Sequence, residues 1–388
     1  MREVAVIGVG VTKFGELWEE SFRNLGISAG LKAISDANLS GSEVDAMYVG
    51  NMSAGRFINQ HHIGALIADY SGMASSNVPA TRIEAGGASG SMAFRQGVMA
   101  VASGMHDIVV VGGAEKMTDV DDNSSNSIVD SAADQQWESA MGATFPSLFA
   151  MIARRCMHEG MVTREQMASV AVKNHAHGAL NPNAQFRKAI SMDMVLKASM
   201  VADPLGMFDC APISDGAAAV VLCPLDIAKK YTENPVRVAS TTQASDTLAL
   251  FQRDDITTFS ATAAAAKRAY ELAKVGPSDI NVAEVHDNYT ISEILALQDL
   301  GFFKRGEAGK AIMDGQATYG GKLVVNTSGG LKARGHPIGA TGVAQIVELT
   351  EQLRGTADKR QVPGARYGLA QNTGGTGSAV VVSILEAV

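Results

Sequence analysis

The sequence predicts an α/β protein made of two halves with the same order of elements. Short apolar runs typical of buried strands are repeatedly followed by a glycine-rich turn and then by apolar residues at helical spacing. The chain has 40 glycines in 388 residues, more than the usual share of about 7%, and they cluster in these turns. The order turn, small-residue helix, strand and Gly-Gly in 82–113 recurs in 335–377, although identity between the two segments is weak.

In the first half, apolar runs alternate with helical patterns. The helix after the glycine-rich turn 82–92 is rich in small residues, so it can be buried on most sides. The glycines after the first strand do not make a dinucleotide-binding motif, because Lys13 stands where the third glycine belongs. The predicted elements are strand 4–7, helix 20–38, strand 46–50, helix 93–103 and strand 107–113.

The middle of the chain has a different character. Residues 119–138 are acidic and serine-rich, so we expect a surface loop there. Residues 139–205 are rich in methionine and helical in pattern, which is also typical of a helical insert with an adaptable core. His175 and His177 are two residues apart and point to different faces of a helix, so we expect both on the surface.

The second half returns to alternating strands and helices. Two of its turns carry histidines. The predicted elements are strand 214–222, helix 260–275, strand 282–286, helix 291–300, strand 322–326, a turn with helix 335–353 and strand 365–370.

His286 and His336 are the candidate catalytic residues of this half. His286 ends a predicted strand, on the edge where open α/β sheets bind ligands. His336 precedes Pro337 at a helix start, where unpaired N–H groups favour negative charge. A histidine beside such donors suits an enzyme that stabilises an oxyanion. Each residue taken alone could equally be a histidine buried in the core. Because both lie at strand-to-helix turns of the same half, a catalytic role is favoured over a structural one.

Composition excludes several classes of protein. The net charge is −8 and no basic patch with interleaved aromatics occurs, so we expect no nucleic-acid partner. The three cysteines have no C-x-x-C or zinc-site spacing, which fits a reducing cytoplasm. The N-terminal apolar run is too short for a signal peptide, and no run approaches the ~20 residues of a membrane span. We therefore expect a cytoplasmic protein without a membrane partner.

Four motifs that follow one another along the chain resemble those of the thiolase superfamily. The resemblance runs from Arg2 to the C-terminus, and it is closest to archaeal acetoacetyl-CoA thiolases and thiolases of the sterol-carrier-protein type. The motifs are 110–117 (VVGGAEKM), 214–218 (SDGAA), 284–289 (EVHDNY) and 329–342 (GGLKARGHPIGATG).

The resemblance implies the thiolase fold, in which two topologically repeated βαβαβαββ halves pack in five layers with an inserted loop domain over the acyl-CoA. The implied domains are an N-terminal half 1–118, a loop domain 119–210, a return to the N-terminal half 211–240 and a C-terminal half 241–388.

The resemblance also shows that groups needed for chemistry are missing. A thiolase needs a thiolate nucleophile and a second acid/base. Position by position, the nucleophilic cysteine is matched by Gly87, and the two alternative positions of the second cysteine are matched by Asn372 and Asn288. A serine near the CoA chain of several relatives is matched by Ala211.

Other parts of the implied site are retained. The residue matched by His286 positions a water in the enolate oxyanion hole, and that matched by His336 activates the nucleophile and donates to the same hole. Backbone N–H groups of Gly87 and Gly374 form the second hole. We do not expect a substitute nucleophile, because Ser89 should point elsewhere and Cys210 should be buried.

The resemblance thus implies an acetyl-CoA C-acetyltransferase, acting by Claisen condensation or thiolysis of acetoacetyl-CoA in lipid metabolism and the mevalonate pathway, with transfer impaired at Gly87. Two alternatives are an acyl-CoA lyase or aldolase-like enzyme that uses only the oxyanion holes, and a non-catalytic acyl-CoA-binding subunit. No cofactor is expected apart from coenzyme A as part of the substrate. The implied partners are a second copy in a homodimer or tetramer, a hydroxymethylglutaryl-CoA synthase and an OB-fold zinc-binding protein.

Overall fold

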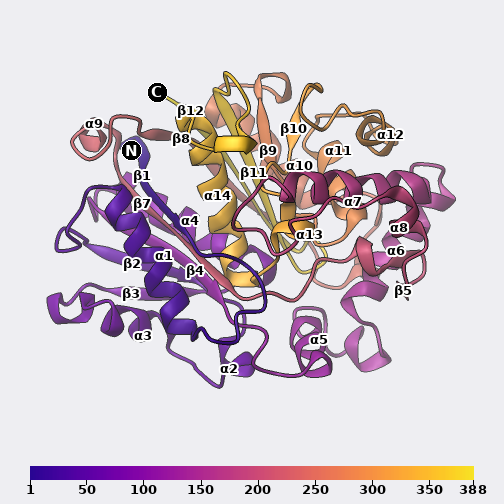
Figure 1. Ribbon diagram of the computed structural model, residues 1–388, viewed down its shortest axis with the longest axis horizontal. Helices are drawn as coiled ribbons and strands as arrows, with labels where there is room; N and C mark the ends of the chain where they lie inside the picture. The colour runs from indigo at the N-terminus through magenta and orange to yellow at the C-terminus, as the bar shows by residue number, and fades with distance from the viewer.

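A computed structural model describes residues 1–388, and the chain folds into two halves with an insert (Figure 1). The first half contains β1 (Val4–Val11), α1 (Phe22–Asp36), β2 (Ala46–Gly50), α2 (Ala54–Phe57), α3 (Ile63–Tyr70), β3 (Ala80–Ile83), α4 (Ser89–Ser103), β4 (Val109–Glu115), β7 (Gly216–Pro224) and α9 (Leu225–Ala228). The second half contains β8 (Val236–Ser245), α10 (Ser260–Ala273), β9 (Val282–Glu284), α11 (Thr290–Asp299), α12 (Ala308–Met313), β10 (Val324–Val325), α13 (Gly330–Arg334), α14 (Ile338–Arg354), β11 (Tyr367–Gly374) and β12 (Ala379–Ala387).

The two halves have the same strand topology, as the sequence predicts. The order is β3-β2-β4-β7-β1 in the first half and β10-β9-β11-β12-β8 in the second. In each half the first three strands of this order are parallel, and the last two pair antiparallel with their neighbours. The halves join where β1 pairs with β8 at Ala5 and Val6, so that all ten strands form one continuous sheet.

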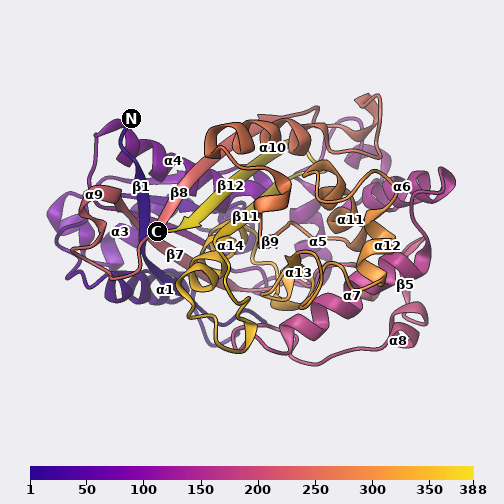
Figure 2. The same cartoon turned by 90° about the horizontal axis from the view of Figure 1, so that it is seen from above.

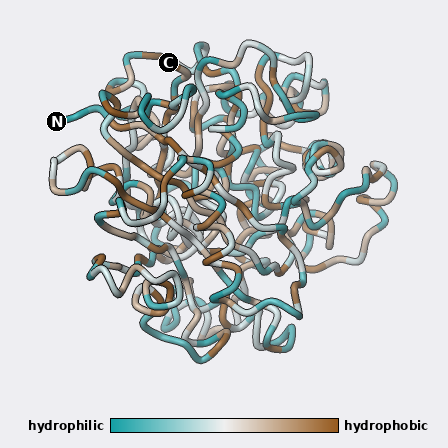
Figure 3. The backbone as a smooth tube through the Cα atoms, turned by 60° about the vertical axis from the view of Figure 1, so that its left-hand side comes forward, coloured by the Kyte–Doolittle hydropathy of each residue, from teal (hydrophilic) through white to brown (hydrophobic).

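Helices and strands pack in five layers, which confirms the predicted fold class. Helices α4 and α14 lie against each other between the two half-sheets, and Figure 1 shows α14 in the middle of the molecule. Helices α1 and α3 cover the outer face of the first half, and α10 covers β8 and β12 on the opposite side (Figure 2). Three large clusters of buried apolar residues fill the spaces between these layers. Brown, apolar stretches of the chain accordingly run through the interior in Figure 3.

The central helices end within one residue of the predicted positions, whereas α4 begins at Ser89, four residues before the predicted start. Pro337 precedes α14 with φ of −63°, which suits a helix start. Gly355 ends this helix with φ of 75°, and Gly104 ends α4 with φ of 84°. These are left-handed conformations that glycine adopts without steric cost. No helix combines the length and the apolar composition needed to cross a bilayer.

The insert between β4 and β7 is mostly helical, and one expectation about it is wrong. It contains α5 (Asp122–Asp130), α6 (Phe145–His158), α7 (Arg164–Gly178), α8 (Met192–Leu196), β5 (Met200–Ala202) and β6 (Leu205–Gly206). Helix α5 lies within 119–138, where we expected a loop. Asp121 caps it by accepting the N–H groups of Asn123 and Ser124, and Ile128 is buried. A capping aspartate and one apolar contact therefore outweigh the polar composition.

The expectation that His175 and His177 lie on the surface is also wrong, because other elements cover both faces of α7. The His177 Nδ1 lies 3.0 Å from the Asn326 carbonyl oxygen of the second half. The His175 ring stacks on Phe186 of the insert itself, with the centroids 5.6 Å apart. Both histidines are buried, although they point to different faces of their helix.

Candidate active site

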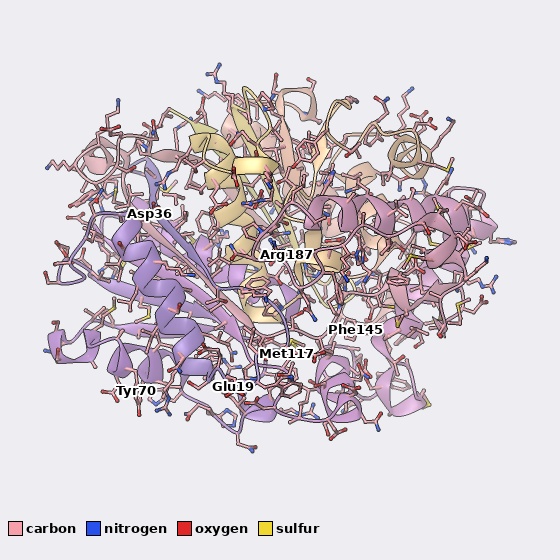
Figure 4. The ribbon with its side chains drawn as sticks, viewed as in Figure 1. Glu19, Asp36, Tyr70, Met117, Phe145 and Arg187 are labelled. Atoms are coloured by element: carbon pink, nitrogen blue, oxygen red, sulfur yellow. The ribbon has the colours of Figure 1, made fainter.

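A cavity of about 180 Å³ lies where the first half, the second half and the insert meet. Figure 4 labels two residues of its wall, Met117 just after β4 and Phe145 at the start of α6. The cavity wall also contains Gly87, Cys210, His286, Asn288, His336 and Thr373. Tertiary structure thus brings both candidate histidines and the matched nucleophile position to one space.

The repeated topology explains why these residues meet. Gly87 lies between β3 and α4, and His336 lies between β10 and α14, which are equivalent positions in the two halves. His286 follows β9, and Gly374 ends the neighbouring parallel strand β11. All four positions follow the carboxyl ends of strands, which is where open α/β sheets bind ligands.

His286 is held by two consecutive residues of β11. Its backbone N–H donates to Gln371 Oε1 at 3.0 Å, and its Nδ1 lies 2.8 Å from the side-chain nitrogen of Asn372. The ring is buried and lies edge-on to His336, with the centroids 5.2 Å apart and the planes at 88°. Burial, together with the nearby His336, lowers the pKa of His286 well below its usual value.

Ser214 holds the backbone of His336, and Thr341 holds its ring. Its backbone N–H donates to Ser214 Oγ at 2.9 Å, and its Nδ1 lies 2.7 Å from Thr341 Oγ1 in the first turn of α14. Burial, with a contribution from the positive charge of Arg334, lowers the pKa of His336 to about 3. Both histidines of the cavity are therefore neutral at neutral pH.

Gly87 lies in a short turn, Gly86–Ala88, that packs against the end of β11. A Cβ atom on residue 87 would lie 2.4 Å from the Thr373 carbonyl oxygen and 3.0 Å from His286 Cε1. A Cβ on Gly374 would lie 2.1 Å from the Ala85 carbonyl oxygen. The two backbones are thus too close for side chains. Gly87 stands in the first turn before α4, where N–H groups lack intrahelical partners.

The structure separates the two possible substitute nucleophiles. Ser89 is buried, donates to the Gly86 carbonyl at 2.6 Å and accepts the Ala85 N–H at 2.9 Å, so it points away from the cavity. Cys210 is only partly buried and forms part of the cavity wall, which corrects our expectation that it is buried. Burial nevertheless raises the pKa of the Cys210 thiol to about 12, so it is not a thiolate at neutral pH.

The resemblance placed the insert over the acyl-CoA, but sequence reasoning did not single out Asp130 or Tyr289 as parts of the cavity wall. Asp130 of α5 borders the cavity and accepts the Phe145 N–H at 2.7 Å. Tyr289 stacks on Phe149 of α6, with the ring centroids 4.4 Å apart, and also borders the cavity. Tyr289 stands in a motif that the sequence singled out, but no local pattern indicates which helix covers it.

The fold and the site define a protein of the thiolase type, and comparison with known families agrees. The family models "Thiolase, N-terminal domain" and "Thiolase C-terminal domain-like" match residues 4–226 and 242–387. The chain therefore belongs to the thiolase family.

Similar proteins cover the whole chain. The acetyl-CoA acetyltransferase of Methanothermobacter thermautotrophicus is 56% identical over 386 residues, with 100% of both chains covered. That of Methanocaldococcus jannaschii is 47% identical over 393 residues, covering 100% of this chain and 99% of its own. A solved structure described as Ltp2-ChsH2(DUF35) aldolase has 28% identity and a TM-score of 0.87, covering 99% of this chain and 98% of its own.

Proposed function

We propose that this protein binds an acyl-CoA in the cavity and acts as an acetyl-CoA C-acetyltransferase, with acyl transfer impaired by Gly87. The substrates are then acetyl-CoA in the condensation direction and acetoacetyl-CoA with CoA in thiolysis. The observation that carries the proposal is the meeting of His286 and His336 with the turn at Gly87 and the end of β11 around one cavity. The relatives named acetyl-CoA acetyltransferase support the reaction class.

The residues present suit one part of this chemistry better than the other. A thioester carbonyl placed beside the N–H groups of Gly87 and Gly374 would be polarised. A neutral imidazole would then take a proton from the carbon adjacent to that carbonyl. The step that would form a covalent acyl-enzyme has no thiolate to accept the acyl group. Loss of a nucleophile that works with a base lowers the rate by about 10⁶ in a serine hydrolase, so acyl transfer should be slow.

Mass spectrometry of the intact protein after incubation with acetyl-CoA tests the nucleophile. We expect no acetyl adduct on the natural chain and little thiolysis of acetoacetyl-CoA. Calorimetry with CoA and acetyl-CoA tests binding separately, and no heat at millimolar ligand would contradict the proposed site. An adduct that disappears in Cys210→Ala would show that Cys210 replaces the nucleophile that is missing at residue 87.

A second candidate is an acyl-CoA lyase of the aldolase kind, which the closed packing at Gly87 favours. Such an enzyme cleaves a β-hydroxyacyl-CoA without a covalent intermediate. One imidazole takes the hydroxyl proton, the carbon–carbon bond breaks, and its electron pair forms an enolate that then takes up the proton. The products are a carbonyl compound and a shorter acyl-CoA, so no oxidant or other reactant is needed. The structural likeness to an aldolase supports this candidate.

Product analysis separates the candidates. Release of a shorter acyl-CoA and a carbonyl compound from a β-hydroxyacyl-CoA supports the lyase. Binding of acyl-CoA without any product supports the non-catalytic subunit.

A homodimer or tetramer, a hydroxymethylglutaryl-CoA synthase and an OB-fold zinc-binding protein remain proposed partners, and co-purification of the untagged proteins with this chain tests them.

A further inference from the structure

We infer that Asn372 is a positioning residue that holds His286 with its proton on Nε2, so that the two histidines of the cavity have opposite tautomers. His286 then presents a donor to the cavity and His336 presents an acceptor. The inference goes beyond the proposed function, because it assigns separate roles to the two rings and gives a role to the asparagine that stands where many thiolases have their second cysteine.

The first step concerns which end of the Asn372 amide faces His286. The Asn372 Oδ1 lies 2.6 Å from the point where a Cβ on Gly342 would stand, and the Ser91 backbone nitrogen lies 2.3 Å from the same point. Ser91 is the third residue of α4, where the positive end of the helix dipole favours an oxygen. The amide oxygen thus lies beside the start of α4, where it makes no hydrogen bond, and the amide nitrogen faces the His286 ring.

The second step follows from the donor role of an amide nitrogen. The Asn372 nitrogen is 2.8 Å from His286 Nδ1, so Nδ1 must accept and cannot carry a proton. The proton of the neutral ring is then on Nε2, which lies 3.2 Å from the Cβ position of Gly87. The backbone N–H of His286 is held by Gln371, so β11 fixes both the main chain and the ring.

The His336 ring is held in the opposite tautomer, with its proton on Nδ1. Thr341 Oγ1 donates its only proton to the Pro337 carbonyl at 3.0 Å, a common bond to the residue four positions earlier. It can therefore only accept from His336 Nδ1, which lies 2.7 Å away. The proton of this ring is on Nδ1, and the Nε2 lone pair is left free as a base.

The two rings meet edge-on, 5.2 Å apart, on the wall of one cavity. A base and a neutral N–H donor are what enolate formation at a thioester requires: the base removes the α-proton, and the donor binds the developing oxyanion. This consequence rests on the proposed acyl-CoA site. The assignment of the tautomers does not, since it follows from the ligand-free protein.

Nitrogen-15 NMR of the whole chain, labelled at histidine and free of ligand, tests the assignment. Spectra of His286→Gln and His336→Gln identify the two rings. We expect the proton of His286 on Nε2 and that of His336 on Nδ1 in the natural chain. A proton on His286 Nδ1 would overturn the inference without any variant at residue 372.

Asn372→Asp tests the role of the asparagine itself. An aspartate of the same shape can only accept when ionised, so we expect a proton to appear on His286 Nδ1 while His336 is unchanged. Asn288→Asp is the matched control, because Asn288 borders the same cavity but its side chain is bonded to the Tyr289 N–H and not to the His286 ring, and it should leave both tautomers as they are. An unchanged His286 in Asn372→Asp would contradict the inference.

Deuterium exchange into the methyl group of acetyl-CoA links the assignment to function, because it reports enolate formation without needing a nucleophile. Loss of one oxyanion donor typically lowers a rate by about 10²–10³, so we expect a loss of at least tenfold in Asn372→Asp. If the natural chain has the expected tautomers but exchanges no deuterium, the proposed function fails and the inference about Asn372 stands. If exchange occurs but His286 carries its proton on Nδ1, the inference about Asn372 fails and the proposed function stands.

Discussion

Residue 87 has no room for a side chain. The nearest obstacles are a backbone carbonyl, that of Thr373, and the ring of His286, which is itself held by β11. A carbonyl in a paired strand moves less easily than the end of a flexible side chain. Glycine at this position is thus required by the packing of the two halves, in addition to being the departure that removes the nucleophile.

Gly87→Ala should therefore destabilise the protein. Overpacking a well-packed site costs about 1–3 kcal/mol, and thermal unfolding should show a clear fall in Tm. Gly30→Ala is the control, since Gly30 lies inside α1 and its Cβ would meet nothing within 4 Å. That change should leave Tm unchanged or raise it slightly. An equal Tm for both variants would show that the turn at residue 87 adjusts freely.

His177 should make stability depend on pH. Burial, followed by the charge of Lys173, lowers the pKa of His177 in the folded protein to about 3, whereas it is about 6.5 in an unfolded chain. Between these values the unfolded state binds a proton that the folded state does not, so stability falls as the pH falls from 6.5 towards 3.

The prediction is clearest as a difference between two proteins. We expect the stability advantage of the natural chain over His177→Gln to shrink below pH 6.5, by up to about 1.4 kcal/mol per pH unit. Groups that titrate in both proteins cancel in this difference. Urea unfolding at pH 8, 6 and 5 measures it, and a constant difference would contradict a neutral buried His177.

At the scale of elements, Glu115 joins the end of β4 to the start of α14. Its buried carboxylate accepts the N–H groups of Met52 at 2.8 Å and Gly339 at 3.0 Å, and the side-chain amide of Asn51 at 2.8 Å. Burial raises the pKa of Glu115 to about 7. Gly339 is in the first turn of α14, so this carboxylate helps to fix the helix that follows His336.

Glu115→Gln should loosen that junction. The amide nitrogen of glutamine would face at least one N–H donor, and a buried donor left without a partner costs about 1–3 kcal/mol. Chemical denaturation measures the loss. Glu43→Gln changes an exposed glutamate that contacts only Ser40 and its neighbours, and it should cause no measurable change. The prediction fails if the two variants unfold alike.

At the scale of the molecule, strand β3 is an edge of the ten-stranded sheet. The Pro79 carbonyl accepts from Met47 of β2, and the Ile83 carbonyl accepts from Asn51 just after β2. In this parallel pair the backbone groups of Ala80 and Arg82 therefore face outward. Such an edge can pair with another chain. A second copy of this chain is the partner that closed symmetry favours.

We expect light scattering at micromolar concentration to give at least twice the chain mass of 40.5 kDa. Ala80→Pro removes one outward N–H without touching a bond to β2, so it should shift the protein towards the monomer while the circular dichroism spectrum stays the same. A natural chain that runs as a 40.5 kDa monomer would exclude assembly at this edge.

The sequence by itself determines many of the strands and helices of each half, though not α5, β3, β8 or β12. It also determines the glycine-rich turns and the placing of His286 and His336 at strand-to-helix turns. These depend on local rules: the period of apolar residues, glycine at left-handed positions and proline at a helix start. The missing side chain at Gly87 is likewise visible in the sequence, because it is the identity of one residue in a recognisable motif.

Only the tertiary structure decides which groups touch. The bond between Asn372 and His286 joins residues 86 apart in the chain, and that between His177 and Asn326 joins residues 149 apart. Burial of His175 and His177 on opposite faces of α7, and the place of Cys210 in the cavity wall, depend in the same way on elements packed from elsewhere. Periodicity gives the face of an element on which a side chain lies, whereas its partner and protonation state are set by long-range packing, which leaves no local pattern in the sequence.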